Sequence, residues 1–180
     1  MARAFLSPIL AAGLLAAVGL SSGLAQAQER GGLATYKNER HGFSISYPQS
    51  QFIALPVATE DARAFVTPDD KARLLVGTLP NSDGKTLAQY RAFLLAESYP
   101  GAKLDYAPVR DTWFVLSGTR SNGTMFYQRV NFTCGGRAIN SWILVFPAAE
   151  QAIYELVIEQ VHRTYRLGAG KCAPATVAAK

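Results

Sequence analysis

The chain has 180 residues, of which 49% are hydrophobic and 17% are charged, and its formal net charge is +5. This composition fits one folded domain large enough to bury a core, and it excludes a disordered tail. The sequence contains no run of five or more Lys and Arg residues. The basic balance therefore does not indicate nucleic-acid binding.

Residues 1–27 have the pattern of a cleavable signal peptide. Arg3 supplies the positive charge of a short N-terminal region, and a mostly apolar run extends from Ala4 to Leu20. Ala25-Gln26-Ala27 matches the small-x-small pattern of a cleavage site. The alternative is an uncleaved membrane anchor, because residues 4–25 carry no charge and could span a bilayer. We expect cleavage, a periplasmic or secreted protein, and no stable membrane anchor afterwards.

The first part of the remaining chain predicts a lead-in followed by three strands. Residues 28–41 are polar and lack periodicity, which is typical of a flexible lead-in. Residues 42–48 alternate apolar and small polar side chains, so Phe43, Ile45 and Tyr47 should share one face of a strand. Residues 63–67 and 72–79 predict two further strands, joined as a hairpin by the turn at 68–70.

A helix is predicted from residue 86 to about residue 98. Thr86 and Gln89 form a capping-box pattern at its start, and Pro100-Gly101 ends it. Leu87, Tyr90 and Leu94 form one apolar stripe that Phe93 widens. A helix with so broad an apolar face should pack against another element.

Four antiparallel strands follow, at residues 102–109, 112–119, 124–133 and 137–146. Asn122-Gly123 and Gly135-Gly136 supply tight turns between them. In the second and fourth of these strands both alternating sets of side chains are apolar, which indicates that both faces of the sheet are covered.

A closing helix at about 148–166 carries an apolar set at helical spacing: Ala149, Ala152, Ile153, Leu156, Val157 and Val161. Two helices and a two-sided sheet predict an α+β fold, a three-layer α/β/α sandwich with a mostly antiparallel sheet. The expected order is β-β-β-α-β-β-β-β-α within a single domain at 42–167, followed by a tail at 168–180.

Two cysteines lie in the exported part of the chain. An isolated pair in an oxidising compartment favours a disulfide, so we expect Cys134 to bridge Cys172 and to tether the tail to a hairpin. A redox-active pair is the alternative, and the absence of a C-x-x-C spacing disfavours it.

The strand at 42–48, the segment at 71–76, the strand at 113–118 and the terminal helix occur in an order that resembles the PsbP/Mog-like superfamily. The resemblance covers roughly residues 40–166, and small exported bacterial proteins with that fold share the Phe-x-Cys-Gly-Gly-Arg pattern of residues 132–137. It implies a β-hairpin, a helix, a four-stranded antiparallel sheet and a closing helix. It also implies binding or accessory work more than catalysis.

The residues that could carry catalysis form no recognised motif. The two histidines, His41 and His162, lack a metal-ligand spacing and are interpreted as surface residues. No G-x-S-x-G elbow occurs, so any serine hydrolase triad would have to recruit one of these histidines. We therefore predict no catalytic residue, no metal and no cofactor.

Two groups of side chains are candidate binding sites. Four aromatic residues on successive strands form a candidate groove for a small apolar ligand: Tyr106, Trp113, Tyr127 and Trp142. The alternative is that they are core residues under the helices. Arg129, Arg137 and Lys171 form a candidate anion-binding edge, for which the alternative is a solvated basic rim.

The sequence thus favours a non-enzymatic periplasmic accessory or binding domain that contacts another exported protein or a small ligand. Its working surface is expected at a sheet edge or a loop face. The alternatives are a secreted hydrolase of unrecognised type and a structural envelope-stress protein.

Overall fold

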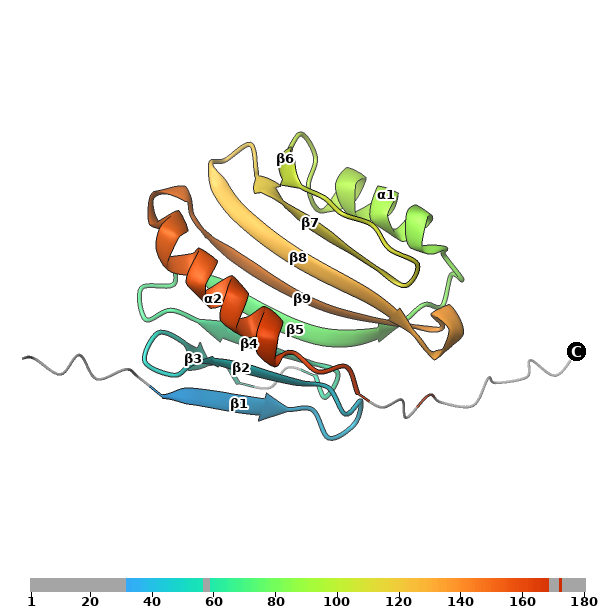
Figure 1. Cartoon of the computed structure of the whole chain (residues 1–180), viewed down its shortest axis with the longest axis horizontal. Helices are drawn as coiled ribbons and strands as arrows, with labels where there is room; N and C mark the ends of the chain where they lie inside the picture. The colour runs from blue at the N-terminus through green and yellow to red at the C-terminus, as the bar shows by residue number, and fades with distance from the viewer. Residues whose placement is uncertain (1–31, 57–58, 169–171, 173–180) are drawn as a thin grey trace, which may run out of the picture. The chain divides into compact units, whose positions relative to one another are not determined.

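The structure, a computed structural model, describes residues 32–56, 59–168 and 172. Its elements in chain order are β1 (Leu33–Lys37), β2 (Ser44–Pro48), β3 (Ile53–Ala54), β4 (Ala62–Val66), β5 (Arg73–Pro80), α1 (Leu87–Glu97), β6 (Lys103–Tyr106), β7 (Trp113–Thr119), β8 (Thr124–Thr133), β9 (Ala138–Pro147) and α2 (Gln151–Thr164). Short 3₁₀ turns at Cys134–Gly136 and Ala148–Glu150 precede β9 and α2. The predicted α+β class and the positions of both helices are confirmed (Figure 1).

The strands form a seven-stranded sheet in the order β3-β4-β5-β9-β8-β7-β6, and β1 pairs with β2 in a separate two-stranded sheet. All neighbouring strands run antiparallel. The longest pairing joins β8 to β9, from Thr124 opposite Pro147 to Thr133 opposite Ala138. The predicted hairpin around residues 68–70 is present as the β4–β5 pair.

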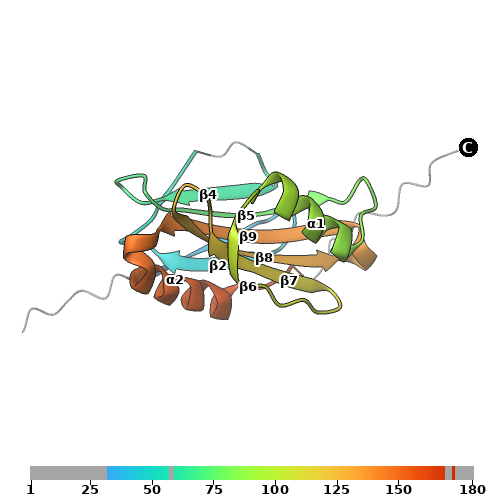
Figure 2. The same ribbon diagram turned by 90° about the horizontal axis from the view of Figure 1, so that it is seen from above.

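The two helices lie on opposite faces of the large sheet, as the three-layer prediction requires (Figure 2). On one face α1 covers a buried cluster that includes Phe114, Leu116 and Phe126. On the other face α2 and the two-stranded sheet cover a cluster around Trp142 and Leu144. Both faces of the central strands β7, β8 and β9 therefore contribute to the core, because neighbouring side chains on a strand point in opposite directions.

The predicted lead-in at 28–41 is wrong for residues 33–37, which form the edge strand β1. Its backbone pairs with β2, from Leu33 opposite Pro48 to Lys37 opposite Ser44. Only Tyr36 packs firmly inward, with its ring 6.0 Å from the rings of Phe43 and Phe65. Since most side chains of β1 are polar or exposed, its strand character comes from pairing and not from a hydrophobic pattern. The two-residue strand β3 was also not predicted.

The start of α1 follows its sequence signal, but its apolar face is narrower than predicted. Thr86 accepts a hydrogen bond from the backbone of Gln89, and the Gln89 side chain accepts one from the backbone of Thr86, so the capping box is confirmed. Tyr90 and Leu94 are buried. Phe93, which was expected to widen the stripe, is 43% exposed, because the position before Leu94 is rotated about 100° away from it around the helix axis.

In α2 the buried stripe also differs from the predicted one. Tyr154, Val157 and Val161 are buried, whereas Ile153 and Leu156 are 52% and 69% exposed. The reason is the side of the helix that faces the sheet, which carries Tyr154, Val157 and Val161. Residues one position before the buried stripe are rotated about 100° away from the core.

The disulfide between Cys134 and Cys172 is present, as predicted. Cys134 lies in the turn between β8 and β9, and Cys172 follows α2. A second tie comes from a pair of backbone hydrogen bonds between Ser44 and Arg166, at 3.0 and 2.9 Å. The chain after α2 is therefore attached both to the two-stranded sheet and to the main sheet.

Candidate functional site

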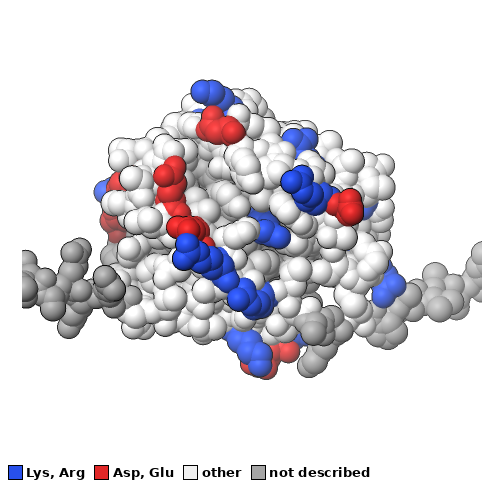
Figure 3. Space-filling view, in the orientation of Figure 1, with Lys and Arg blue, Asp and Glu red and all other residues white. Residues whose placement is uncertain are grey.

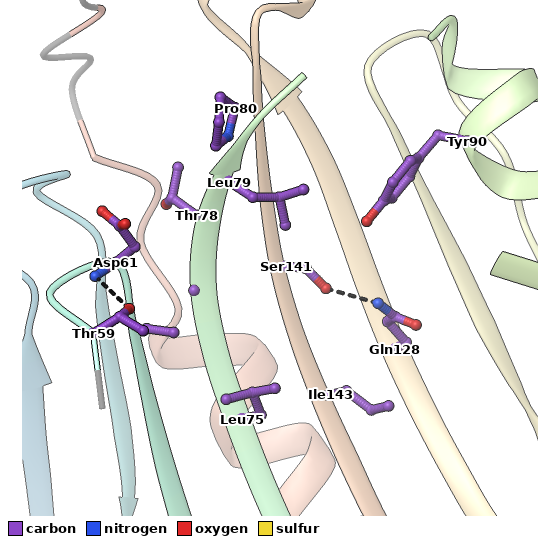
Figure 4. Close-up of a pocket in the computed structure, with 12 residues that line it drawn as sticks. Thr59, Asp61, Leu75, Thr78, Leu79, Pro80, Tyr90, Gln128, Ser141 and Ile143 are labelled. Carbon is purple, nitrogen blue, oxygen red and sulfur yellow. Dashed lines mark hydrogen bonds between the residues drawn. The ribbon is translucent and has the colours of Figure 1, made fainter. Parts of the chain in front are cut away.

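A hollow of about 350 Å³ opens on the α1 face of the large sheet, over β4, β5 and β9. We call it the α1-side hollow; its lining residues are Thr59, Asp61, Ala62, Leu75, Gly77, Thr78, Leu79, Pro80, Tyr90, Gln128, Ser141 and Ile143 (Figure 4). It exists because α1 covers β7 and β8 but leaves β4 and β5 uncovered on this side. Leu75 and Leu79 are accordingly 45% and 42% exposed.

The floor of the hollow is a row of three small residues on adjacent strands. Ala62 of β4 lies opposite Gly77 of β5, which in turn lies opposite Ser141 of β9. On one side of this row the larger Leu75 and Ile143 pair with each other, and on the other side stands Leu79. Small side chains between two larger rows leave a depression in the pleated surface.

Gly77 is required by the close approach of β4. A Cβ atom placed on it would lie 2.8 Å from the Cβ atom of Ala62, which is closer than carbon atoms pack. The backbone N–H of Thr78 also donates to the carbonyl of Asp61 at 2.9 Å. The register of this edge thus depends on the same glycine that opens the floor.

Tyr90 of α1 forms the wall of the hollow opposite residues 59–61, which precede β4. Its ring packs between Phe93 and Phe132, with centroids 5.9 and 5.8 Å away, and the residue is only 8% exposed. Its hydroxyl group points from the helix into the hollow, toward Gln128 and Ser141 (Figure 4). Burial raises the pKa of Tyr90, so the phenol remains protonated at neutral pH.

A chain of polar side chains runs under the wall. The Tyr99 hydroxyl donates to Gln128 Oε1 at 2.5 Å, and Gln128 Nε2 donates to Ser141 Oγ at 2.9 Å. Burial raises the pKa of Tyr99 well above its usual range, which keeps it a hydrogen-bond donor. Because Ser141 Oγ accepts in this chain, its own proton is free to donate toward the hollow.

The rim at the far end carries a compact charged group. Asp61 Oδ1 lies 2.7 Å from His41 Nε2 and 3.1 Å from Arg40 Nη1. The hydrogen bond with His41, with further help from the nearby Arg40 charge, lowers the pKa of Asp61. Buried Asn38 holds this corner together, since its side chain accepts from the His41 backbone and donates to the Glu60 carbonyl.

Solved structures of known proteins share this arrangement of elements. Cyanobacterial PsbP (CyanoP) from Synechocystis sp. is 16% identical, over 86% of this chain and 98% of that chain, with a TM-score of 0.56. The Ran-binding protein Mog1p from Saccharomyces cerevisiae is 10% identical, over 76% and 95% of the two chains, with a TM-score of 0.54. A mutant form of the protein Mog1 is 12% identical over 76% and 96%, with a TM-score of 0.53. The chain has the PsbP/Mog1 fold.

The likeness to PsbP and Mog1 is one of fold, since one fold hosts many functions. No protein-family model and no curated protein matches the sequence. The sequence-based resemblance to the PsbP/Mog-like superfamily is therefore confirmed at the level of architecture. The function of this chain depends on its own surface, which the fold alone does not specify.

The four aromatic residues of the predicted ligand groove all face the α2 side of the PsbP/Mog1 sheet, but they do not line one cavity. Trp142 is fully buried, and Tyr127 stacks on it at 4.9 Å. Trp113 is half-buried beneath the Arg129 guanidinium, which lies 4.4 Å from its ring. Tyr106 is 55% exposed and lines a hollow of about 500 Å³ between β6 and α2.

The residues of the predicted anion edge have separate roles where they are described. Arg129 donates to Asn131 Oδ1 at 3.1 Å and lies 3.3 Å from His162 Nδ1. Arg137 is exposed, and its backbone carbonyl accepts from the Asn81 N–H at 2.8 Å. Lys171 lies outside the described residues. On the α2 face, acidic side chains lie before the basic ones along the helix, whose last turn carries His162 and Arg163 (Figure 3).

Among the described residues, no group of three or more His, Cys, Asp and Glu side chains could hold a metal ion. In the same part of the chain, no helix is long and apolar enough to cross a membrane.

His162 makes stability depend on pH. Partial burial, followed by the nearby positive charge of Arg129, lowers its pKa below the usual 6.5. As the pH falls through 6.5, the unfolded chain therefore takes up a proton that the folded protein does not, and the free energy of unfolding decreases. We expect urea denaturation to show lower stability at pH 5.5 than at pH 7.5, with a smaller difference in His162→Gln. An equal difference in the variant would contradict the assignment to His162.

The α1-side hollow was not predicted from the sequence. Its one local signal is Gly77, a glycine inside a strand pattern, which indicates a bulge or a close approach of another segment. The row formed with Ala62 and Ser141 depends on register between strands that lie far apart in the chain, so the sequence alone does not reveal it.

Proposed function

We propose that this protein is a non-enzymatic binding or accessory protein that acts outside the cytoplasm, with the α1-side hollow as its working surface. One observation carries the proposal. The structure leaves an apolar depression open on a sheet whose central strands are otherwise covered on both faces, and a nearly buried tyrosine directs its hydroxyl group into it. Apolar hollows with a few convergent polar groups are the usual form of binding sites.

Two features support an extracytoplasmic location. The leader at 1–27 has the pattern of a signal peptide. The bridge between Cys134 and Cys172 is of a kind that persists mainly in oxidising compartments. Both features favour export of the chain to the periplasm or beyond.

The pair formed by His41 and Asp61 is the observation that a hydrolase would need first, because a histidine base is commonly oriented by a carboxylate. Such a base must also contact a hydroxyl nucleophile. Among the described residues, no Ser or Thr hydroxyl group hydrogen bonds to the ring of His41 or His162; their ring contacts are to Asp61 and Arg129. This geometry favours binding over hydrolysis.

The occupant is either an exported protein or a small ligand. Mog1p, which shares the fold, is described as Ran-binding, so protein binding has a precedent in this architecture.

Recovery of bound cargo tests the proposal. We expect the tagged full chain, expressed in its source cell, to be isolated from the periplasmic fraction with a specific protein or small molecule, identified by mass spectrometry. The double variant Leu75→Asp/Leu79→Asp should reduce this cargo at least tenfold, because both side chains are exposed at the hollow.

The matched control is Leu156→Asp, which makes the same change at a 69% exposed leucine of α2, on the other face of the sheet, and should leave the cargo unchanged. Cargo that is lost equally in both variants would contradict the assigned surface. Ester or peptide hydrolysis by the purified protein that disappears in His41→Ala would support the hydrolase instead.

A further inference from the structure

We propose that the α1-side hollow binds a small, uncharged, mostly apolar molecule that presents one hydrogen-bond acceptor to Tyr90 and Ser141. This inference rests on the proposed function and specifies the ligand chemistry of its site. It follows from the shape of the hollow, from the hydrogen-bonding state of its two hydroxyl groups, and from the charges around it.

The shape suits a flat or slender group. The rows at Leu75 and Leu79 are four residues apart on β5, which corresponds to about 13 Å along the strand. Between these two leucines, the small residues Gly77 and Ser141 form the floor on two neighbouring strands. Neighbouring strands of a sheet are about 4.8 Å apart. The volume of about 350 Å³ lies at the lower end of the range for small-molecule sites.

The Tyr90 hydroxyl group is the strongest sign of a ligand. The residue is 8% exposed and its ring is fixed between Phe93 and Phe132, while its hydroxyl group faces the open hollow and makes no hydrogen bond to the described residues. Because solvent reaches the hydroxyl group there, a ligand that enters the hollow must accept from it in place of water. A hydroxyl group held in this way is pre-arranged to donate to whatever enters the hollow.

Ser141 supplies a second donor beside it. Its Oγ atom already accepts from Gln128 Nε2 at 2.9 Å, and Gln128 in turn accepts from Tyr99. This order of donors leaves the Ser141 proton directed away from the chain of hydrogen bonds. One carbonyl or ether oxygen of a ligand could accept from both hydroxyl groups, whereas a hydrocarbon would leave both without a partner.

The charges around the hollow select against ions. None of its described lining residues is Lys or Arg, so nothing there would neutralise an anion. The Asp61 carboxylate at the rim is already paired with His41 and Arg40, so it offers little to a cation. Moving an unpaired charge onto this apolar surface would cost free energy, and the ligand is therefore neutral.

Two probes of nearly the same shape test the acceptor. Acetophenone carries a carbonyl group and ethylbenzene does not, and each is titrated into the full chain while NMR follows the methyl signals of Leu75, Leu79 and Ile143. We expect both probes to shift these signals, with acetophenone binding about three- to tenfold more tightly, as one net hydrogen bond implies. In Tyr90→Phe, which retains the ring, the preference should fall to less than twofold.

Ser141→Ala provides a second, independent variant and should also reduce the preference for acetophenone at least twofold. Equal affinity of the two probes, an unchanged preference in both variants, or shifts confined to residues outside the hollow would overturn the inference. The proposed function would still stand in that case if Leu75→Asp/Leu79→Asp abolished cargo recovery, because that experiment uses no probe. Recovery of a protein that covers the hollow, with no probe binding, would also overturn the small-ligand inference.

Discussion

Replacing Phe126 with Ala is expected to lower the free energy of unfolding by about 3–5 kcal/mol, as deletion of a fully buried aromatic ring usually does. Phe126 of β8 is 0% exposed and stacks on Tyr99 with ring centroids 3.9 Å apart. It lies under α1, so its removal leaves a cavity between the sheet and the helix layer. Urea denaturation followed by circular dichroism measures the change.

The matched control is Phe93→Ala, which removes the same ring from α1 itself. Phe93 is 43% exposed, so we expect a loss below about 1 kcal/mol. Equal losses from the two variants would contradict the placement of α1, because they would mean that the helix buries Phe93 and Phe126 to the same extent.

Removal of the disulfide is expected to have an effect of similar size. Cys134 and Cys172 are 38 residues apart, and chain-entropy reasoning gives about 4 kcal/mol for a loop of that length. For a domain of this size the corresponding decrease in Tm is on the order of 10 °C. We expect the double variant Cys134→Ser/Cys172→Ser to show this decrease in a thermal denaturation experiment.

Reductant provides the internal control for the bridge. It should lower the Tm of the unmodified protein to that of the double variant and should leave the double variant unchanged. If reductant had no effect on the unmodified protein, the bridge would not contribute to stability, and the attachment of the chain after α2 would depend on the Ser44–Arg166 pairing alone.

Local signals in the sequence predicted most of the fold. The capping box at Thr86 and Gln89 located the start of α1, and the alternating patterns located the long strands, because both depend on residues close together in the chain. The strand β1 was missed since its stability comes from pairing with β2 and its side chains are mostly polar or exposed. The orientation of α2 was a further difficulty: apolar Ile153 and Leu156 are exposed because the helix turns Tyr154, Val157 and Val161 toward the sheet.

The candidate site was harder to predict than the fold for a related reason. The aromatic residues were predicted to line a groove, yet size and hydrophobicity also place a residue such as Trp142 in the core, where it is fully buried. The α1-side hollow depends on small residues that lie opposite one another on three neighbouring strands: Ala62, Gly77 and Ser141. Only cross-strand register brings these residues together, and it is set by the whole sheet.

A crystal structure of the purified protein soaked with acetophenone would test most directly whether the hollow beside α1 is a binding site. We predict one probe molecule lying over Gly77 and Ser141, between Leu75 and Leu79, with its carbonyl oxygen within hydrogen-bond distance of Tyr90 Oη. A probe bound only on the α2 face, or a hollow closed by the leucine side chains with no probe inside, would contradict the assignment.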